Sequence, residues 1–218
     1  KQDKAVRDAC RAKLSTLIST MQAHSSKSAR LCGNGGLHSL YQQLITDSRI
    51  TLAERPVQNM TTSDLRARCH LVAALLLLSG SQDAGSKVPD EVSNGRVEQA
   101  AVKVSSAATL HMSVDVLMVR AVTEAAPPRS NWAAAADTLR AATKADSADC
   151  GAWFRLGLVL GCTDSGLYAY DEGEAALRSC IKIRPSHAVA HLRLGILLKS
   201  IRKLPSDAEK CYRRAIHV

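Results

Sequence analysis

Hydrophobic residues recur at helical spacing in the last third of the chain. From Trp153, apolar or very small residues follow at offsets 3, 4 and 7, ending at Leu160. Residues with this spacing share one face of an α-helix, and Gly157 at offset 4 allows a neighbouring helix to approach closely. A second helical stripe starts at Gly173, and Pro185 ends it because proline cannot continue a helix. The pattern predicts a helix, a turn and a second helix in this stretch.

This stretch resembles the tetratricopeptide (TPR) repeat, whose two helices carry the pattern W-x2-L-G-x2-Y, then A-x3-F, then P. Leu160 replaces the tyrosine of that pattern, Gly173 the alanine and Leu177 the phenylalanine. The first-helix pattern recurs 38 residues later, from His191, and the A-x3-aromatic pattern recurs from Ala208. Weaker copies, built mostly on small residues, come before the first stretch. The resemblance implies an all-α fold, a TPR-like α-solenoid of antiparallel helix pairs.

The repeat pattern divides the chain into two unequal parts. Residues 62–218 carry about three to four TPR-like repeats, with a loop rich in punctuating Gly and Pro inserted at 80–94. Residues 1–61 form an N-terminal helical segment, in which residues 3–23 show one amphipathic stripe and a short helix starts at Leu37. The pattern leaves open whether this segment is a degenerate repeat. Because the chain does not open on Met and stops within a helical pattern, we expect it to be a piece of a longer protein.

Composition agrees with a helical protein. Of the 218 residues 46% are hydrophobic and only 3% aromatic, which suits close helix packing better than a sheet. The longest apolar run is well short of the roughly 18 residues that a membrane span requires. Seven cysteines without a C-x2-C pair form no disulfide framework, so we expect an intracellular, reducing compartment, most simply the cytoplasm.

No motif indicates catalysis, a cofactor or a metal. The chain lacks the Gly-x-Ser-x-Gly, His-Glu-x-x-His and Walker patterns, and its scattered cysteines lack the spacing of a zinc site. His187 and His191 lie one helical turn apart, but one falls at a helix start and the other replaces the packing tryptophan. We therefore expect no enzyme, no cofactor and no bound metal.

The resemblance also implies where a partner would bind. In TPR proteins the first helices of the pairs line a concave groove, and this sequence places apolar and basic residues at those positions. The asparagine with which chaperone-binding members hold a peptide carboxylate is absent there. We expect an apolar groove edged by basic residues, suited to a helix or an extended segment; packing against an adjacent helix of the same chain explains the same residues equally well. The predicted groove residues are Phe154, Arg155, Leu158, Leu192, Arg193, Ile196 and Lys199.

Positive charge is concentrated at the two ends of the chain. The net charge is +5 over residues 1–30, −4 over 31–177 and +8 over 178–218. The resemblance places the basic residues of the last second helices on the convex side, where a solvated face is the ordinary explanation. Contact with RNA or with an acidic protein is the alternative, and scarce aromatic residues would limit RNA contact to phosphate. The predicted basic surface consists of Arg178, Lys182, Lys210, Arg213 and Arg214.

These patterns favour a protein–protein interaction scaffold, a TPR-repeat subunit or segment of a larger multiprotein assembly that binds partner segments in an apolar concave groove. The alternative is a repeat protein that contacts RNA or a ribonucleoprotein through its basic C-terminal convex surface. A purely structural segment without a groove ligand is the third interpretation. The sequence does not identify the partner.

Overall fold

The computed structural model describes residues 2–25, 37–54, 56–57, 60–79, 90–127 and 129–218. Within these residues the regular structure is helical, and no strand occurs among them. Two helices come first, α1 (Gln2–Ser25) and α2 (Leu37–Glu54). The helices that follow are α3 (Thr62–Ser79), α4 (Asp90–Leu110), α5 (Val114–Ala125), α6 (Trp132–Ala145), α7 (Cys150–Leu160), α8 (Tyr170–Ile183), α9 (Ala188–Leu197) and α10 (Pro205–His217). A π-helical turn, Leu198–Arg202, extends α9.

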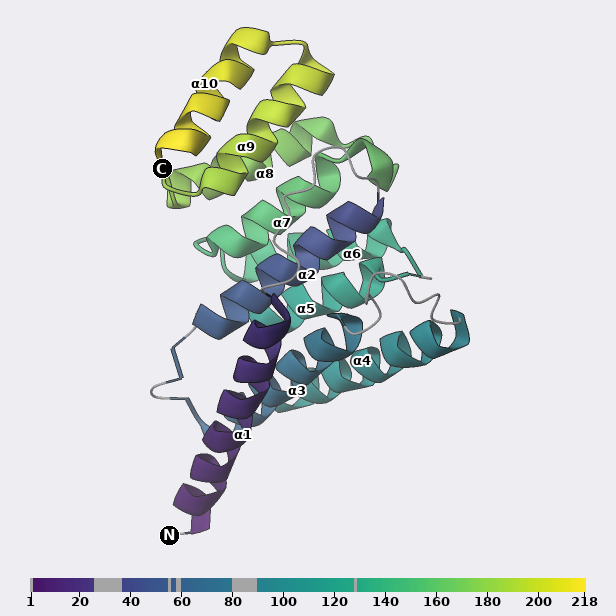
Figure 1. Cartoon of the computed structure of the whole chain (residues 1–218), viewed down its shortest axis with the longest axis vertical. Helices are drawn as coiled ribbons and strands as arrows, with labels where there is room; N and C mark the ends of the chain where they lie inside the picture. The colour runs from purple at the N-terminus through teal and green to yellow at the C-terminus, as the bar shows by residue number, and fades with distance from the viewer. Residues whose placement is uncertain (1, 26–36, 55, 58–59, 80–89, 128) are drawn as a thin grey trace.

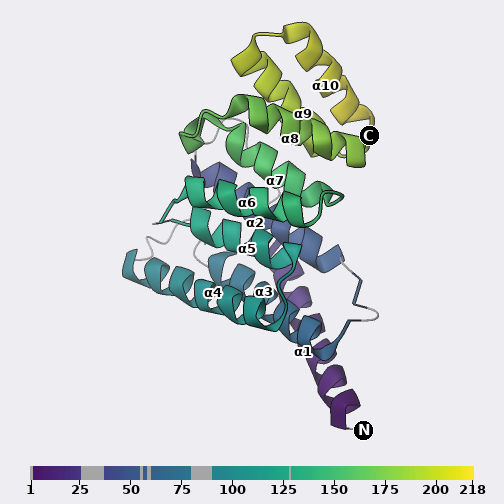
Figure 2. The same ribbon diagram turned by 180° about the vertical axis from the view of Figure 1, so that it is seen from behind.

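Consecutive helices from α3 onward pack as pairs. The pairs are α3 with α4, α5 with α6, α7 with α8, and α9 with α10. Successive pairs stack on one another along the long axis of the molecule, as Figures 1 and 2 show from opposite sides. The result is the all-α, TPR-like α-solenoid of antiparallel helix pairs that the sequence predicts.

Two glycines permit the closest approach within the last two pairs. A Cβ at Gly157 of α7 would lie 2.7 Å from Cγ of Leu177 on α8, and a Cβ at Gly195 of α9 would lie 2.6 Å from Cε1 of Tyr212 on α10. Real Cβ atoms do not tolerate such distances, so a larger residue would push the two helices of a pair apart. The Leu-Gly step in each first helix therefore sets the spacing inside its pair.

The N-terminal helices pack onto the stack rather than extending it as another pair. α1 packs mainly on α3, and α2 lies across α3, α5 and α7, the first helices of three successive pairs. We call the face lined by the first helices α3, α5, α7 and α9 the groove. α2 thus lies in the groove, over its first three helices (Figure 1).

The inserted loop predicted at 80–94 is partly wrong. Residues 80–89 lie outside the described residues, but α4 already begins at Asp90, so residues 90–94 are helical. The sequence opens this helix with Asp90 and Glu91, and acidic residues are favoured at a helix N-terminus by the helix dipole. Gly95, directly after the predicted loop, lies within α4.

The core is deepest around α3. Leu65, Val72 and Leu75 of this helix are completely buried, because α1, α2, α4 and α5 all pack against it. Burial on nearly every side explains why its sequence is apolar all round. Among the described residues, no helix is both long enough and apolar enough to cross a membrane.

Candidate binding groove

The predicted groove residues fall into two sets that differ in burial. Those on α7 are enclosed: Phe154 is 2% exposed, Arg155 1% and Leu158 3%. Those on and after α9 are more accessible, since Leu192, Arg193 and Ile196 are half-buried and Lys199 is exposed. The first set is covered because α2 lies over α7, whereas the second set lies at the end of the groove that α2 leaves largely open.

Arg155 anchors α2 to the groove. Its Nε donates to Oγ of Ser48 at 3.1 Å, and its Nη2 donates to Oγ1 of Thr51 at 2.9 Å, both on α2. Its Nη1 donates to the carbonyl oxygen of Gly151 at 2.9 Å and contacts Sδ of Met118 on α5 at 3.1 Å. A buried guanidinium is tolerated only when its donors are satisfied, and α2 supplies two of these acceptors.

A second arginine binds the same helix farther along the groove. Arg193 of α9 donates from Nη2 to Oε1 of Gln43 on α2. Between the two arginines lies Asp47 of α2; burial raises the pKa of its carboxyl to about 6, although Arg155 and Arg193 both act to lower it. The polar side of α2 therefore faces a row of cationic side chains from the repeats.

Arginines also hold the ends of the N-terminal helices. Arg68 of α3 donates to the carbonyl oxygen of Leu52 near the C-terminus of α2. Arg49 of α2 donates to the carbonyl oxygen of Met21 near the C-terminus of α1. The last carbonyls of a helix lack partners within it and carry partial negative charge, so a cationic donor stabilises them. These contacts join α1, α2 and α3 into one unit.

The side chain of Phe154 packs against His187, the residue just before α9. Its ring lies against the imidazole of His187, with 4.7 Å between the ring centroids. Aromatic pairs at this distance contribute about 0.5–1.5 kcal/mol beyond their buried area. Phe154 is thus part of the packing among α7, α8 and α9, and it presents almost no surface to a partner.

The open end of the groove contains a hollow of about 260 Å³. It lies where the start of α2 approaches α7 and α9, and both apolar and cationic side chains reach it. Its lining includes Ser39, Leu40, Leu158, Arg193, Ile196 and Ile201. A hollow of this size holds one or two apolar side chains, and the half-buried Arg193 lies within it.

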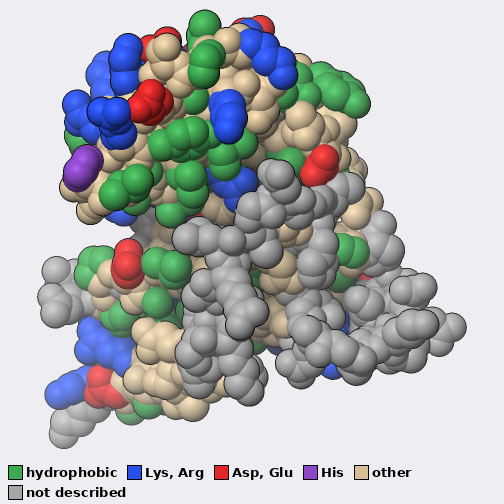
Figure 3. Space-filling view, turned by 45° about the horizontal axis from the view of Figure 1, so that its top comes forward, with side chains coloured by type: hydrophobic (Ala, Val, Ile, Leu, Met, Phe, Trp, Pro, Cys, Tyr) green, Lys and Arg blue, Asp and Glu red, His purple; other side chains and the backbone are tan. Residues whose placement is uncertain are grey.

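The predicted basic surface is exposed but largely neutralised by neighbouring carboxylates. Arg178 lies 2.8 Å from Glu174, Lys210 lies 2.9 Å from Asp207, and Arg213 of α10 pairs with Glu209 in the same way. Lys182 and Arg214 are exposed as well. Figure 3 shows the Lys and Arg side chains gathered over the C-terminal helices with Asp and Glu side chains among them.

The sequence patterns did not predict the contacts that α2 makes with the groove. The sequence shows the apolar stripe of α2, but it does not show where this helix packs on the repeats. The polar residues concerned are Gln43, Asp47, Ser48 and Thr51. The polar face of an amphipathic helix ordinarily faces solvent, so the pattern of α2 did not signal its contact with the groove arginines.

Comparison with solved structures supports the fold. MamA aligns with 83% of this chain and 88% of its own, at 15% identity and a TM-score of 0.53. YrrB, described as a TPR protein with an unusual peptide-binding site, aligns with 92% of this chain and 84% of its own, at 16% identity and a TM-score of 0.49. At this identity the likeness to MamA shows the fold alone, a TPR-like helical repeat. No protein-family model and no curated protein sequence matches the chain.

Proposed function

We propose that this chain is a non-catalytic protein-interaction scaffold of the TPR type, acting inside the cell as a subunit or segment of a multiprotein assembly. The observation that carries the proposal is the position of α2. A helix of the same chain lies in the groove, against α3, α5 and α7, and is held there by Arg155 and Arg193. The groove is therefore shaped to accept a helix, and the stretch over α9 is left for a helix from another protein.

The chemistry of the open stretch indicates the kind of partner. Leu192 and Ile196 are half-buried apolar residues, whereas Lys199 is exposed and basic. Arg193, also cationic, lines the hollow beside them. We infer that the partner segment is an acidic amphipathic helix whose apolar residues, spaced three and four apart, enter the hollow beside Ile196. α2 provides the precedent, since it directs an aspartate and hydroxyl groups toward the groove arginines.

A displayed library of helical segments tests this proposal directly. Selection against the whole chain should enrich acidic sequences with one apolar stripe. The double variant Ile196→Ser and Lys199→Glu should lose these binders, because it makes the hollow polar and reverses the charge at its edge. The control variant is Leu204→Ser, an exposed hydrophobic residue (47%) outside the groove, which should bind as the unmodified chain does.

Two outcomes would argue against binding of an acidic helix in the groove. Selected segments with no charge preference would mean that Arg193 and Lys199 do not contribute to recognition. Equal loss of binding in the Leu204→Ser control would place the contact elsewhere on α9 and α10.

The alternative, RNA contact through the basic convex surface, has less support. Three of its five residues, Arg178, Lys210 and Arg213, already pair with carboxylates on their own helices. Phosphate contact would have to compete with these pairs. Protein binding therefore has the stronger support, and the salt dependence of RNA binding tests the alternative.

A further inference from the structure

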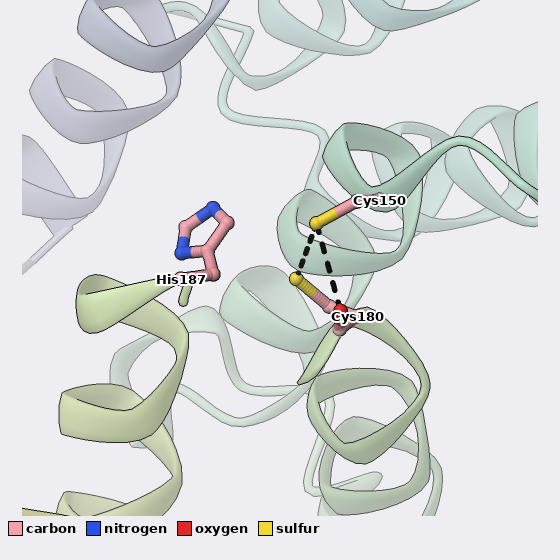
Figure 4. Close-up of side chains that lie close together, drawn as sticks. All are labelled: Cys150, Cys180 and His187. Atoms are coloured by element: carbon pink, nitrogen blue, oxygen red, sulfur yellow. Dashed lines mark hydrogen bonds between the residues drawn. The ribbon is translucent and has the colours of Figure 1, made fainter. Parts of the chain in front are cut away.

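Two cysteines meet at the junction of α7, α8 and α9. Cys150 is the first residue of α7 and Cys180 lies near the end of α8, and their Sγ atoms are 2.8 Å apart. His187, just before α9, completes the group, and a nitrogen of its ring and the two sulfurs all lie within 4.8 Å of one another. Figure 4 shows the Cys150 and Cys180 sulfurs directed toward each other, with the His187 ring beside them. No sequence motif indicated this group, because 30 residues separate the cysteines.

The surroundings of Cys150 favour its thiolate. The hydrogen bond between the two thiols lowers the pKa of Cys150, and the nearby guanidinium of Arg184 acts in the same direction, against burial and Asp149. The N-terminus of α7 adds the positive end of a helix dipole, which is a common setting for reactive cysteines. The same hydrogen bond and burial raise the pKa of Cys180, so the two thiols differ in character.

The tautomer of His187 argues against a metal site. Its Nδ1 accepts a hydrogen bond from the backbone N–H of Ala190 at 3.1 Å and thereby caps α9. Burial and Arg184 lower the pKa of His187, which keeps the ring neutral. A neutral ring that accepts at Nδ1 carries its proton on Nε2, so Nε2 is a donor and offers no lone pair to a metal.

Access to the pair is narrow and one-sided. Cys150 is 7% exposed and lines a cavity of about 730 Å³, whereas Cys180 is fully buried. Phe154, Arg155, Arg184 and His187 also line this cavity, together with Asp47 of α2. A small oxidant can reach Cys150 through it, but a bulky disulfide reagent cannot reach Cys180.

We propose that Cys150 and Cys180 form a dithiol site that reacts with hydroperoxides, with Cys150 as the attacking thiolate and Cys180 as the resolving thiol. The Cys150 thiolate attacks one peroxide oxygen, the O–O bond breaks, and the released hydroxide is protonated to water, leaving Cys150 as a sulfenic acid. The Cys180 sulfur, after losing its proton, attacks the Cys150 sulfur; the S–O bond breaks and a second water leaves. The two thiols lose two electrons in total, and the peroxide gains them.

The test uses the whole reduced chain treated with hydrogen peroxide, alkylated and digested for mass spectrometry. We expect one peptide pair joined through Cys150 and Cys180, about 2 Da lighter than the two reduced peptides because two hydrogens are lost. Cys180→Ala should instead leave a sulfenic acid at Cys150, which dimedone traps. Alanine is close to cysteine in size, so this variant should retain its circular dichroism melt.

Cys211→Ser is the matched control and should form the same Cys150–Cys180 link. Because the thiolate is the nucleophile, Cys150 should be oxidised about tenfold faster than Cys211, whose pKa burial raises. Peroxide that consumes Cys211 first, or that leaves Cys150 and Cys180 both alkylatable, would overturn the proposal. Equimolar Zn²⁺ that survives a chelator and protects both thiols from alkylation would also overturn it, in favour of a metal site.

Discussion

The groove has two stretches that use equivalent residues differently. Arg155 and Arg193 occupy the same position in successive repeats, 38 residues apart. Both arginines donate to α2, but over α7 the arginine is 1% exposed and enclosed, whereas over α9 it is half-buried and lines an open hollow. A repeat position thus fixes which face a side chain occupies, but the neighbouring chain decides whether that face is core or surface.

The largest contrast is expected in stability. Phe154→Ala should lower the free energy of unfolding by about 3–5 kcal/mol, because it opens a cavity beneath α2 and beside His187. Ile196→Ala removes a side chain that is only half-buried and should cost about 1 kcal/mol or less. Urea denaturation followed by circular dichroism measures both. An equal loss of unfolding free energy in the two variants would mean that α2 covers the groove residues of α7 and α9 to the same extent.

The second contrast concerns the anchoring of α2. Arg155→Ala removes hydrogen bonds to Ser48 and Thr51 from a charged donor, worth about 3 kcal/mol in sum at roughly 1.5 kcal/mol each. Amide hydrogen exchange in residues 37–54 should then accelerate about 150-fold, the factor that this energy implies. Arg178→Ala, which breaks one exposed ion pair, is the control and should leave that exchange unchanged. Unchanged exchange in both variants would show that apolar packing alone holds α2.

A third prediction uses pH. The pKa of Asp47 is raised to about 6 in the folded protein, from an ordinary 3.8, so its protonated form is favoured by folding. Stability should therefore increase as the pH falls from 7 through 6 toward 4, by about 1.3 kcal/mol between pH 7 and 5. Thermal melts at the two pH values should show this gain, and Asp47→Asn should abolish the Asp47 contribution. A gain of the same size in Asp47→Asn would assign it to other groups.

The smallest effect on stability is expected on the convex side. Replacing Arg178, Lys182, Lys210 and Arg214 by Gln should change the free energy of unfolding by less than about 1 kcal/mol, since exposed charges contribute little. We also expect no binding of single-stranded RNA at about 50 mM salt. The RNA alternative would instead be established by RNA binding that weakens with salt and is less salt-dependent in the variant. The slope of the logarithm of the binding constant against the logarithm of salt concentration should then be smaller in magnitude by about 3, roughly 0.7 for each lost phosphate contact.

The spacing of apolar and small residues predicted the helix pairs α7–α8 and α9–α10 well, and the reason is physical. The Leu-Gly step and the small residues of α7 to α10 act within one pair, so their spacing in the sequence reports their contact directly. Gly157 against Leu177 and Gly195 against Tyr212 are examples. The groove residues Leu192, Ile196 and Lys199 were predicted by position, and their role in binding remains a proposal.

What the sequence could not predict depends on contacts between distant segments. The stripe on α2 indicates an amphipathic helix but does not specify the face against which it packs. Arg155 was expected at the edge of the groove, because the acceptors that bury it, Ser48 and Thr51, lie more than a hundred residues earlier. The Cys150–Cys180 contact was missed for the same reason, since each cysteine alone is typical of a small buried residue.

The position of α2 also bears on how the chain folds. In a linear repeat array each pair contacts only its neighbours, so folding can begin anywhere and the ends fray independently. Here the hydrogen bond from Arg155 joins residues 107 positions apart, and closing so long a loop raises contact order and slows folding. We expect α2 to couple the first three pairs into one cooperative block, while α9 and α10 open separately. Native-state hydrogen exchange should give a single opening free energy for α3, α5 and α7 and a lower one for α10.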